Sequence, residues 1–194
     1  MNTPTLSTAR LVLRRFTLED LPAFHSLLAD ETVNAFLPWF PAQTRAQARE
    51  HLVERYISTY QNPAGLRYAI CLREGDTPIG YVNISPAPAY DLGYALQKEH
   101  WGKGIALEAS CAVVAQAKKQ GLPFVTATHD RENLRSGAVM RKLGMSYCYT
   151  YKEQWQPKNI PVYFRMYQQN FGAHSSTYME YWNTYPEHFI EQGL

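Results

Sequence analysis

The spacing of apolar and polar residues changes several times along the chain, and each change predicts a secondary-structure element. Residues 10–16 alternate loosely between apolar and polar side chains, as a half-buried strand does. Thr17 then offers a helix N-cap followed by two acidic residues, which predicts a helix to about residue 29. Thr44 offers a second cap, for a helix to about residue 60 whose apolar stripe includes Ala48, Leu52 and Tyr56.

The rest of the chain predicts two further helices among strands. Residues 102–120 form a long segment that is rich in Ala, apolar on nearly all sides and followed by Gly121 as a stop. A shorter helix over residues 133–143 can start at Asn133 and end before Gly144. The expected strands are residues 66–72, 79–84, 90–96, 124–128, 146–154 and 162–168. The order β-α-α-β-β-β-α-β-α-β-β indicates a mixed α/β layered fold.

Composition and charge narrow the classes of function. The 194 residues, 45% of them apolar, suit one globular domain with room for an appendage. A net charge of +2 without a Lys/Arg cluster gives no reason to expect a nucleic-acid partner. No apolar run approaches about 18 residues and the first residues do not resemble a secretory signal, so we expect no membrane span and a cytoplasmic location. The three cysteines, Cys71, Cys111 and Cys148, lie far apart and predict neither a disulfide framework nor a metal site.

The segment richest in chemistry is the one that leads from the strand at residues 90–96 into the long helix. Gly102 and Gly104 permit a tight turn and a close approach of a ligand to the backbone. The unpaired N–H groups and the partial positive charge of a helix start then form an anion site that suits a phosphate or pyrophosphate. An ordinary strand-to-helix turn is the alternative. The nucleotide P-loop is excluded because Gln97 stands where its first glycine belongs. The dinucleotide fingerprint is excluded because Leu107 stands where its third glycine belongs.

Three segments together resemble the GNAT N-acetyltransferase superfamily. Residues 101–106, WGKGIA, resemble its acetyl-CoA pyrophosphate loop. The next motif of the superfamily is similar to Asn133, the pair Arg135-Ser136 and the run from Arg141 to Met145. Residues 8–14 are similar to the Rim-type branch, the ribosomal-protein alanine/serine N-acetyltransferases and their relatives. The resemblance covers about residues 7–170.

The resemblance implies a fold and a way to hold acetyl-CoA as co-substrate, and the histidines show no spacing that would predict a metal site. The fold is a mixed, mostly antiparallel sheet of about seven strands flanked by helices, in which the strands at residues 90–96 and 124–128 splay apart. The pantetheine arm would pair with the open edge of the first of these strands near Ala95, Leu96 and Gln97. The pyrophosphate would sit on the N–H groups of Gly102, Lys103, Gly104, Ile105, Ala106 and Leu107, with Lys103 either near a phosphate or merely solvated.

The reaction implied is direct transfer of an acyl group to a primary amine. Many relatives have a Tyr that protonates the thiol, but Met140 stands at that position here. We therefore expect Ser136 to hydrogen-bond the thiol and Asn133 to contact the cofactor, unless they serve only as a first-turn serine and an N-cap. Glu153 is the first candidate for the base, followed by Asp91 and by the pair His129-Asp130.

Residues 171–194 lie beyond the resemblance and form a predicted C-terminal aromatic helical extension to a domain at residues 1–170. Tyr178, Tyr181, Trp182 and Tyr185 fall on one helical face. This face would pack on its own core, dock on a second subunit, or wall the acceptor groove. The aromatics of the preceding strand, Tyr147, Tyr149, Tyr151 and Trp155, share one parity, which predicts that one sheet face carries all four.

The sequence leaves the acceptor open. The expected enzyme acetylates a protein N-terminus or a small amine such as a polyamine, an amino acid or a drug. The alternative is a catalytically silent acyl-CoA-binding module, and either could be a monomer or a homodimer.

Overall fold

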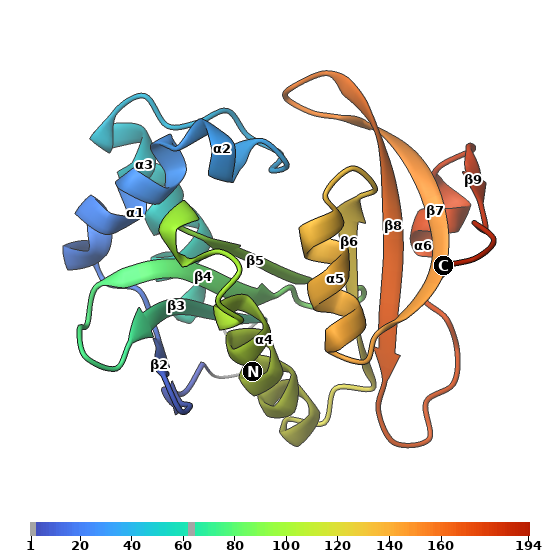
Figure 1. Cartoon of the computed structure of the whole chain (residues 1–194), viewed down its shortest axis with the longest axis horizontal. Coiled ribbons are helices and arrows are strands. Elements are labelled where there is room, and N and C mark those ends of the chain that lie inside the picture. Colours follow the sequence, from blue (N-terminus) through green and yellow to red (C-terminus); the bar gives the residue numbers. More distant parts are fainter. Residues whose placement is uncertain (1–2, 62–64) are drawn as a thin grey trace.

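The computed structural model describes residues 3–61 and 65–194, and its strands form two antiparallel sheets (Figure 1). The first sheet has the order β1-β2-β3-β4-β5 and the second the order β6-β8-β7-β9. The strands of the first sheet are β1 (Leu6–Ser7), β2 (Leu11–Arg14), β3 (Leu66–Leu72), β4 (Pro78–Ile84) and β5 (Leu92–Leu96). Those of the second are β6 (Phe124–Asp130), β7 (Ser146–Trp155), β8 (Ile160–Asn170) and β9 (His188–Phe189). The predicted mixed α/β architecture is confirmed, with two-residue strands added at either end of the chain.

The two sheets meet where β5 and β6 begin. Asp91 and Thr126 form an isolated parallel bridge, and the Thr126 N–H donates to the Tyr90 carbonyl at 3.3 Å. Past this bridge the described residues of the two strands form no ladder, and each strand pairs only within its own sheet. The splayed central strands expected from the sequence are therefore present.

Helices cover both faces of the first sheet. On one face lie α1 (Leu21–Ala29), α2 (Glu31–Asn34) and α3 (Arg45–Leu52), which share a core with β3 and β4. The helix predicted to reach residue 60 does so in three pieces, because α3 continues through a π turn at Val53–Ile57 and a 3₁₀ turn at Ser58–Tyr60. On the opposite face lies α4 (Ile105–Lys119), whereas α5 (Leu134–Lys142) packs against β6 of the second sheet. Both helices contribute to the largest core cluster. Short 3₁₀ turns at Leu18–Asp20 and Lys98–His100 and the helix α6 (Glu180–Thr184) complete the elements.

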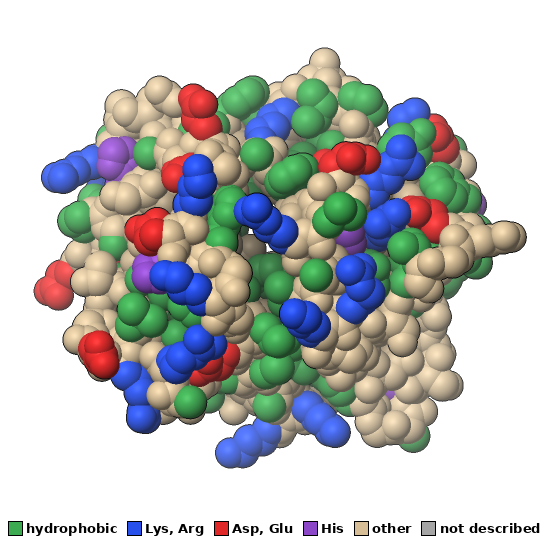
Figure 2. Space-filling view, in the orientation of Figure 1, with side chains coloured by type: hydrophobic (Ala, Val, Ile, Leu, Met, Phe, Trp, Pro, Cys, Tyr) green, Lys and Arg blue, Asp and Glu red, His purple; other side chains and the backbone are tan. Residues whose placement is uncertain are grey.

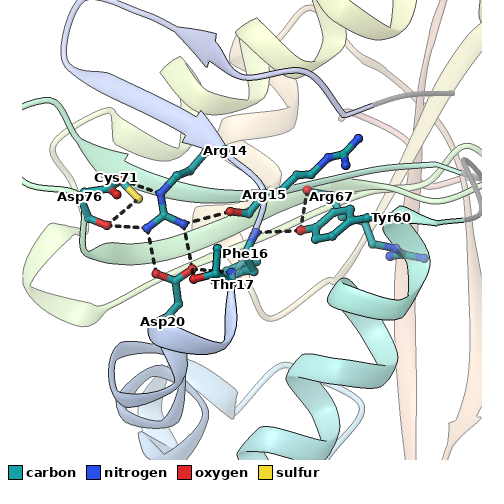
Figure 3. A network of polar contacts seen from close by, with 9 residues as sticks. All are labelled: Arg14, Arg15, Phe16, Thr17, Asp20, Tyr60, Arg67, Cys71 and Asp76. Carbon is teal, nitrogen blue, oxygen red and sulfur yellow. Dashed lines mark hydrogen bonds and ion pairs between the residues drawn. The ribbon is translucent and has the colours of Figure 1, made fainter.

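Arg14, the last residue of β2, forms an ion pair with Asp20, the residue that precedes α1 (Figure 3). The Arg14 guanidinium donates to both carboxylate oxygens of Asp20 at 2.8 Å and also to the side chain of Asp76 in the β3–β4 turn. Asp20 accepts from the Thr17 N–H at 2.8 Å, so the predicted N-cap residue Thr17 and Asp20 form a capping box, which the sequence analysis did not predict. The Arg14 and Asp20 side chains are only 17% and 6% exposed, so this ion pair is well shielded from water.

One prediction about the sheet faces is wrong. The β7–β8 pairing shifts register between Tyr147 and Tyr149, a β-bulge that inserts Cys148 and reverses the parity of the strand. Tyr147 therefore packs on the core under α4 and α5, 5.7 Å from the ring of Tyr167. Tyr149, Tyr151 and Trp155 pack in a cluster on the opposite face.

None of the described helices combines the length and hydropathy needed to cross a bilayer. Within the described part of the chain, no three His, Cys, Asp or Glu side chains are grouped as metal ligands. The cysteines are all free, with Cys71 buried, Cys148 part-buried and Cys111 exposed.

Candidate functional site

The glycine turn before α4 leaves backbone donors free. Gly102 and Gly104 have φ angles of +73° and +75°, which L side chains rarely adopt, so both positions require glycine. The first hydrogen bond of the helix joins the Glu108 N–H to the Gly104 carbonyl at 3.0 Å. The N–H groups of the three residues from Ile105 to Leu107 therefore have no acceptor within the helix. A β-carbon at Gly102 would meet no atom within 4 Å, so an anion has room to approach the turn.

Arg10, Glu108 and Thr8, which the sequence analysis did not identify as site residues, hold the backbone of this turn in position. Arg10 Nη1 donates to the Lys103 carbonyl at 2.9 Å, and Arg10 Nε pairs with Glu108 at 2.6 Å. The Thr8 hydroxyl also donates to Glu108, at 2.6 Å. Burial alone would raise the pKa of Glu108, but the hydrogen bonds from Thr8 and Arg10 outweigh it and lower that pKa. The sequence signal that could have identified Glu108 is its position as an acidic residue in the first turn of α4. The Lys103 side chain is exposed.

The open edge of β5 is set by the alternation of its backbone groups. The Gln97 N–H donates to the Ile79 carbonyl at 2.8 Å, and the Asp91 carbonyl accepts from Ser85 at 2.9 Å. Since backbone groups in an antiparallel pair alternate in direction, the N–H groups of Ala95 and Gln97 point at β4 and those of Tyr94 and Leu96 point at the gap. Of the three residues expected at this edge, only Leu96 thus directs its N–H to the gap. Its carbonyl there accepts from the Trp101 indole at 2.8 Å.

The start of α5 faces this edge. Asn133 caps the helix, and its Oδ1 accepts from the Ser136 N–H at 3.2 Å. The Tyr94 hydroxyl, another group that the sequence reasoning missed, donates to the Ser136 carbonyl at 2.9 Å. The structure thus brings Ser136 beside the β5 edge across the gap, whereas Met140 is buried in the core.

Asp91 lies where the two sheets touch. Its carboxylate accepts from the Thr126 hydroxyl at 3.2 Å, and its N–H donates to the Ser85 hydroxyl at 2.8 Å. None of the ion pairs formed by the described residues includes Asp91. Burial raises the pKa of Asp91 to about 7, against the opposing effect of the Thr126 hydrogen bond. This carboxyl can therefore exchange a proton near neutral pH.

The other candidate bases lie elsewhere. Glu153 is part-buried on β7, which raises its pKa, and it hydrogen-bonds Tyr185 of the extension. His129 packs against α5, because a β-carbon on Gly137 would lie 2.6 Å from its Nε2. Burial lowers the pKa of His129, and its Nδ1 is 2.7 Å from the Asp130 carbonyl. The Asp130 carboxylate accepts from the Glu132 N–H at 2.9 Å in the following turn.

The face that carries α4 and α5 is hollowed at its centre, and Lys and Arg side chains surround the hollow (Figure 2). A shallow depression beside the start of α4 is lined by Thr8, Arg10, Gly104, Leu107, Glu108, Cys111 and Ala112. The free N–H groups, the open β5 edge and these cations together suit an extended anionic ligand that crosses from α4 to the gap.

Comparison with known proteins agrees with this geometry. A family model described as "Acetyltransferase (GNAT) domain" matches residues 10–146. The N-acetyltransferase YnaD of Bacillus subtilis is 25% identical over 144 residues, which cover 72% of this chain and 81% of YnaD. A GNAT-family acetyltransferase structure from Bacillus anthracis superposes with a TM-score of 0.76 at 21% identity, covering 86% of this chain and 98% of that one. The ribosomal L7/L12 α-N-protein acetyltransferase RimL, solved with coenzyme A, superposes with a TM-score of 0.75 at 19% identity, covering 88% and 100% of the two chains.

Proposed function

Because the chain belongs to the GNAT acetyltransferase family, we propose that it transfers the acetyl group of acetyl-CoA directly to a primary amine, as an enzyme of the Rim-type branch. The observation that carries this proposal is the glycine turn with its free N–H groups beside the open β5 edge. The fold shared with RimL and the similarity of residues 8–14 to that branch support it. The transferase domain would span residues 1–170.

In this proposal the chain's own residues hold the cofactor and move protons. Acetyl-CoA supplies the activated acetyl group. The N–H groups from Gly102 to Leu107 hold its pyrophosphate, and Leu96 pairs with its amide arm. Asn133 lies at the start of α5 as a further contact, and Ser136 donates a hydrogen bond to the sulfur.

Asp91, rather than Glu153, is proposed as the base. A protonated amine must lose a proton before it can attack, and a carboxyl whose pKa is about 7 can accept that proton near neutrality. The neutral nitrogen then forms the new N–C bond as the C–S bond breaks. The second proton of the nitrogen ends on the sulfur, so that the products are an acetamide and a free thiol.

The glycine turn provides the first test. Gly104→Val forces a β-branched residue into the left-handed region and places its methyl groups before the anion site, so we expect acetyl-CoA affinity to fall at least about tenfold. Calorimetric titration measures the affinity, and release of free thiol with a panel of amines and peptides measures turnover. Gly75→Val is the control, because Gly75 lies in the distant β3–β4 turn with open space around it. Equal affinities of the two folded variants would refute the proposed cofactor site. Tight binding without turnover on any acceptor would favour a silent acyl-CoA-binding module.

A further inference from the structure

The C-terminal extension, residues 171–194, lies on the face of the second sheet opposite α5 (Figure 1). There Tyr178, Tyr181, Trp182 and Tyr185 pack on a cluster of buried side chains from β7 and β8. Tyr181 stacks on Tyr151 with 5.1 Å between ring centroids and an interplanar angle of 20°. The ring of Tyr178 lies 6.1 Å from that of Phe124, at the start of β6. The extension therefore reaches the edge of the second sheet that faces β5.

Hydrogen bonds fix the extension close to Asp91. Gln168 on β8 donates to the Ser176 carbonyl at 2.8 Å and accepts from the Tyr178 N–H at 2.8 Å. The register of the sheet pairs Gln168 with Thr126, whose hydroxyl donates to Asp91. The Tyr149 hydroxyl also donates to the Tyr178 carbonyl, at 2.7 Å. One strand thus separates the anchor of the extension from the proposed base.

Asp91 acts electrostatically on the tyrosines of this face. Burial is the main cause of the raised pKa values of Tyr151, Tyr178 and Tyr181, and the negative charge of Asp91 raises all three further. Gly93 follows Asp91 on the same face of β5, and a β-carbon there would meet no atom within 4 Å. An acceptor therefore has space beside Asp91, with tyrosine rings from the second sheet and the extension nearby.

The charges around these tyrosines favour a particular ligand. Glu180 accepts from the Tyr178 hydroxyl at 2.5 Å, and Glu153 hydrogen-bonds Tyr185. Neither of these carboxylates nor Asp91 belongs to any ion pair among the described residues. Unpaired carboxylates next to aromatic faces attract an ammonium group and repel a carboxylate.

We propose that the extension supplies one wall of the acceptor site, where Tyr178 and Tyr181 hold a protonated primary amine against Asp91. The acceptor amine bears no adjacent carboxylate, so free α-amino acids are poor substrates, whereas a peptide N-terminus or an alkyl diamine fits. This inference rests on the proposed acetyltransfer. Both tyrosines lie outside residues 10–146, so they give this chain a specificity that the family domain does not determine.

Steady-state kinetics with 1,4-diaminobutane, phenethylamine, phenylalanine and a tripeptide amide test this assignment. For the best amine, Tyr178→Ala and Tyr181→Ala are expected to raise KM at least about tenfold and to change KM for acetyl-CoA less than about twofold. Phe189→Ala is the control, because Phe189 is an aromatic residue of the same extension that contacts Tyr163 instead. Phenylalanine is expected to react at least about tenfold less efficiently than phenethylamine.

A further variant separates binding from folding. Tyr181→Met keeps an apolar side chain over Tyr151 but removes the aromatic face, so it should fold and still raise KM for the amine. Unchanged KM values in this variant and in Tyr178→Ala, or equal use of phenylalanine and phenethylamine, would overturn the inference while the acetyltransferase activity stands. If the unaltered protein binds acetyl-CoA but releases no thiol with any amine, the proposed function itself fails.

Discussion

At the residue scale, the titration of Asp91 governs the expected pH dependence. The proposed base acts only when ionised, and burial raises its pKa to about 7. The Asp91 carboxylate accepts a hydrogen bond from Thr126 and interacts electrostatically with four tyrosines, Tyr94, Tyr151, Tyr178 and Tyr181. These tyrosines stay neutral near pH 7 because their own pKa values are raised. We expect kcat/KM to increase with pH up to about 7, and Asp91→Asn to lower kcat about 10²- to 10⁴-fold and abolish that increase. Glu153→Gln should retain it, and the reverse pattern would make Glu153 the base.

The same carboxyl affects stability with a definite sign. Its pKa is higher in the folded protein than the ordinary 3.8, so the unfolded chain releases this proton at lower pH than the folded chain does. The group therefore destabilises the fold as pH rises from about 4 to 7, and Asp91→Asn removes that effect. Asp91→Asn should unfold at a higher temperature than the unaltered protein at pH 8, and the difference should shrink by pH 4. An equal difference at both pH values would contradict the raised pKa.

Single residues were predictable where the local chain defines their role. Gly102, Gly104 and the N-cap Asn133 follow from turn and helix chemistry within a few residues. Tyr94 and Arg10 were missed because their partners, Ser136 and Glu108, lie 42 and 98 positions away. No periodic pattern carries that information.

At the element scale, the β7–β8 hairpin is tied to α2. Lys158 Nζ donates to the carbonyls of Asn34 and Ala35 at 2.9 and 3.1 Å, and burial lowers the pKa of Lys158. Lys158→Met keeps the apolar stem but leaves both carbonyls without this donor, so we expect a loss of about 1–2 kcal/mol in the free energy of unfolding. Chemical denaturation measures it. Lys152→Met removes an exposed surface pair with Glu187 and should cost less stability than Lys158→Met does. Equal losses of unfolding free energy in the two variants would show that the Lys158 hydrogen bonds to α2 stabilise the protein no more than a surface ion pair does.

Periodicity identified most elements but not their irregularities. The strands β3, β4 and β7 agree closely with the predicted ranges because turn residues bound them, Gly75-Asp76 between β3 and β4 and Gln156-Pro157 after β7. The bulge after Tyr147 escaped prediction, since one inserted residue changes the face of the side chains without interrupting the strand. The π turn at Val53–Ile57 likewise preserves the apolar stripe that indicated a continuous helix.

At the scale of the whole molecule, the bridge between Asp91 and Thr126 is the one that joins the two sheets among the residues that the structure describes. The apolar pattern predicted both central strands, but their separation followed only from the family resemblance. The position of the extension could not be predicted, because its anchors combine β7, β8 and a two-residue strand that pairs with Thr150 and Tyr151. Such contacts depend on the completed second sheet.

Because the two sheets separate beyond this bridge, we expect bound coenzyme A to stabilise the protein by contacting both sheets. Coenzyme A would contact the α4 turn and β5 edge of one sheet and the start of α5 beside the other. A ligand present at about 100 times its Kd stabilises the folded state by about 2.7 kcal/mol, which corresponds to about 5–10 °C in Tm for a chain of this size. Hydrogen exchange should slow most at the N–H groups of Tyr94 and Leu96, since those of Ala95 and Gln97 already point at β4.

The glycine variants provide the control for this link. Gly75→Val should show the full Tm increase with coenzyme A, whereas Gly104→Val should show little at the same concentration, because its anion site is obstructed. Equal protection of the four amides from Tyr94 to Gln97 on binding would place the ligand away from the open edge. An undiminished Tm increase in Gly104→Val would place it away from the turn. Slowed exchange at Tyr94 and Leu96, together with a lost Tm increase in Gly104→Val, is the result expected if one ligand spans the turn and the gap.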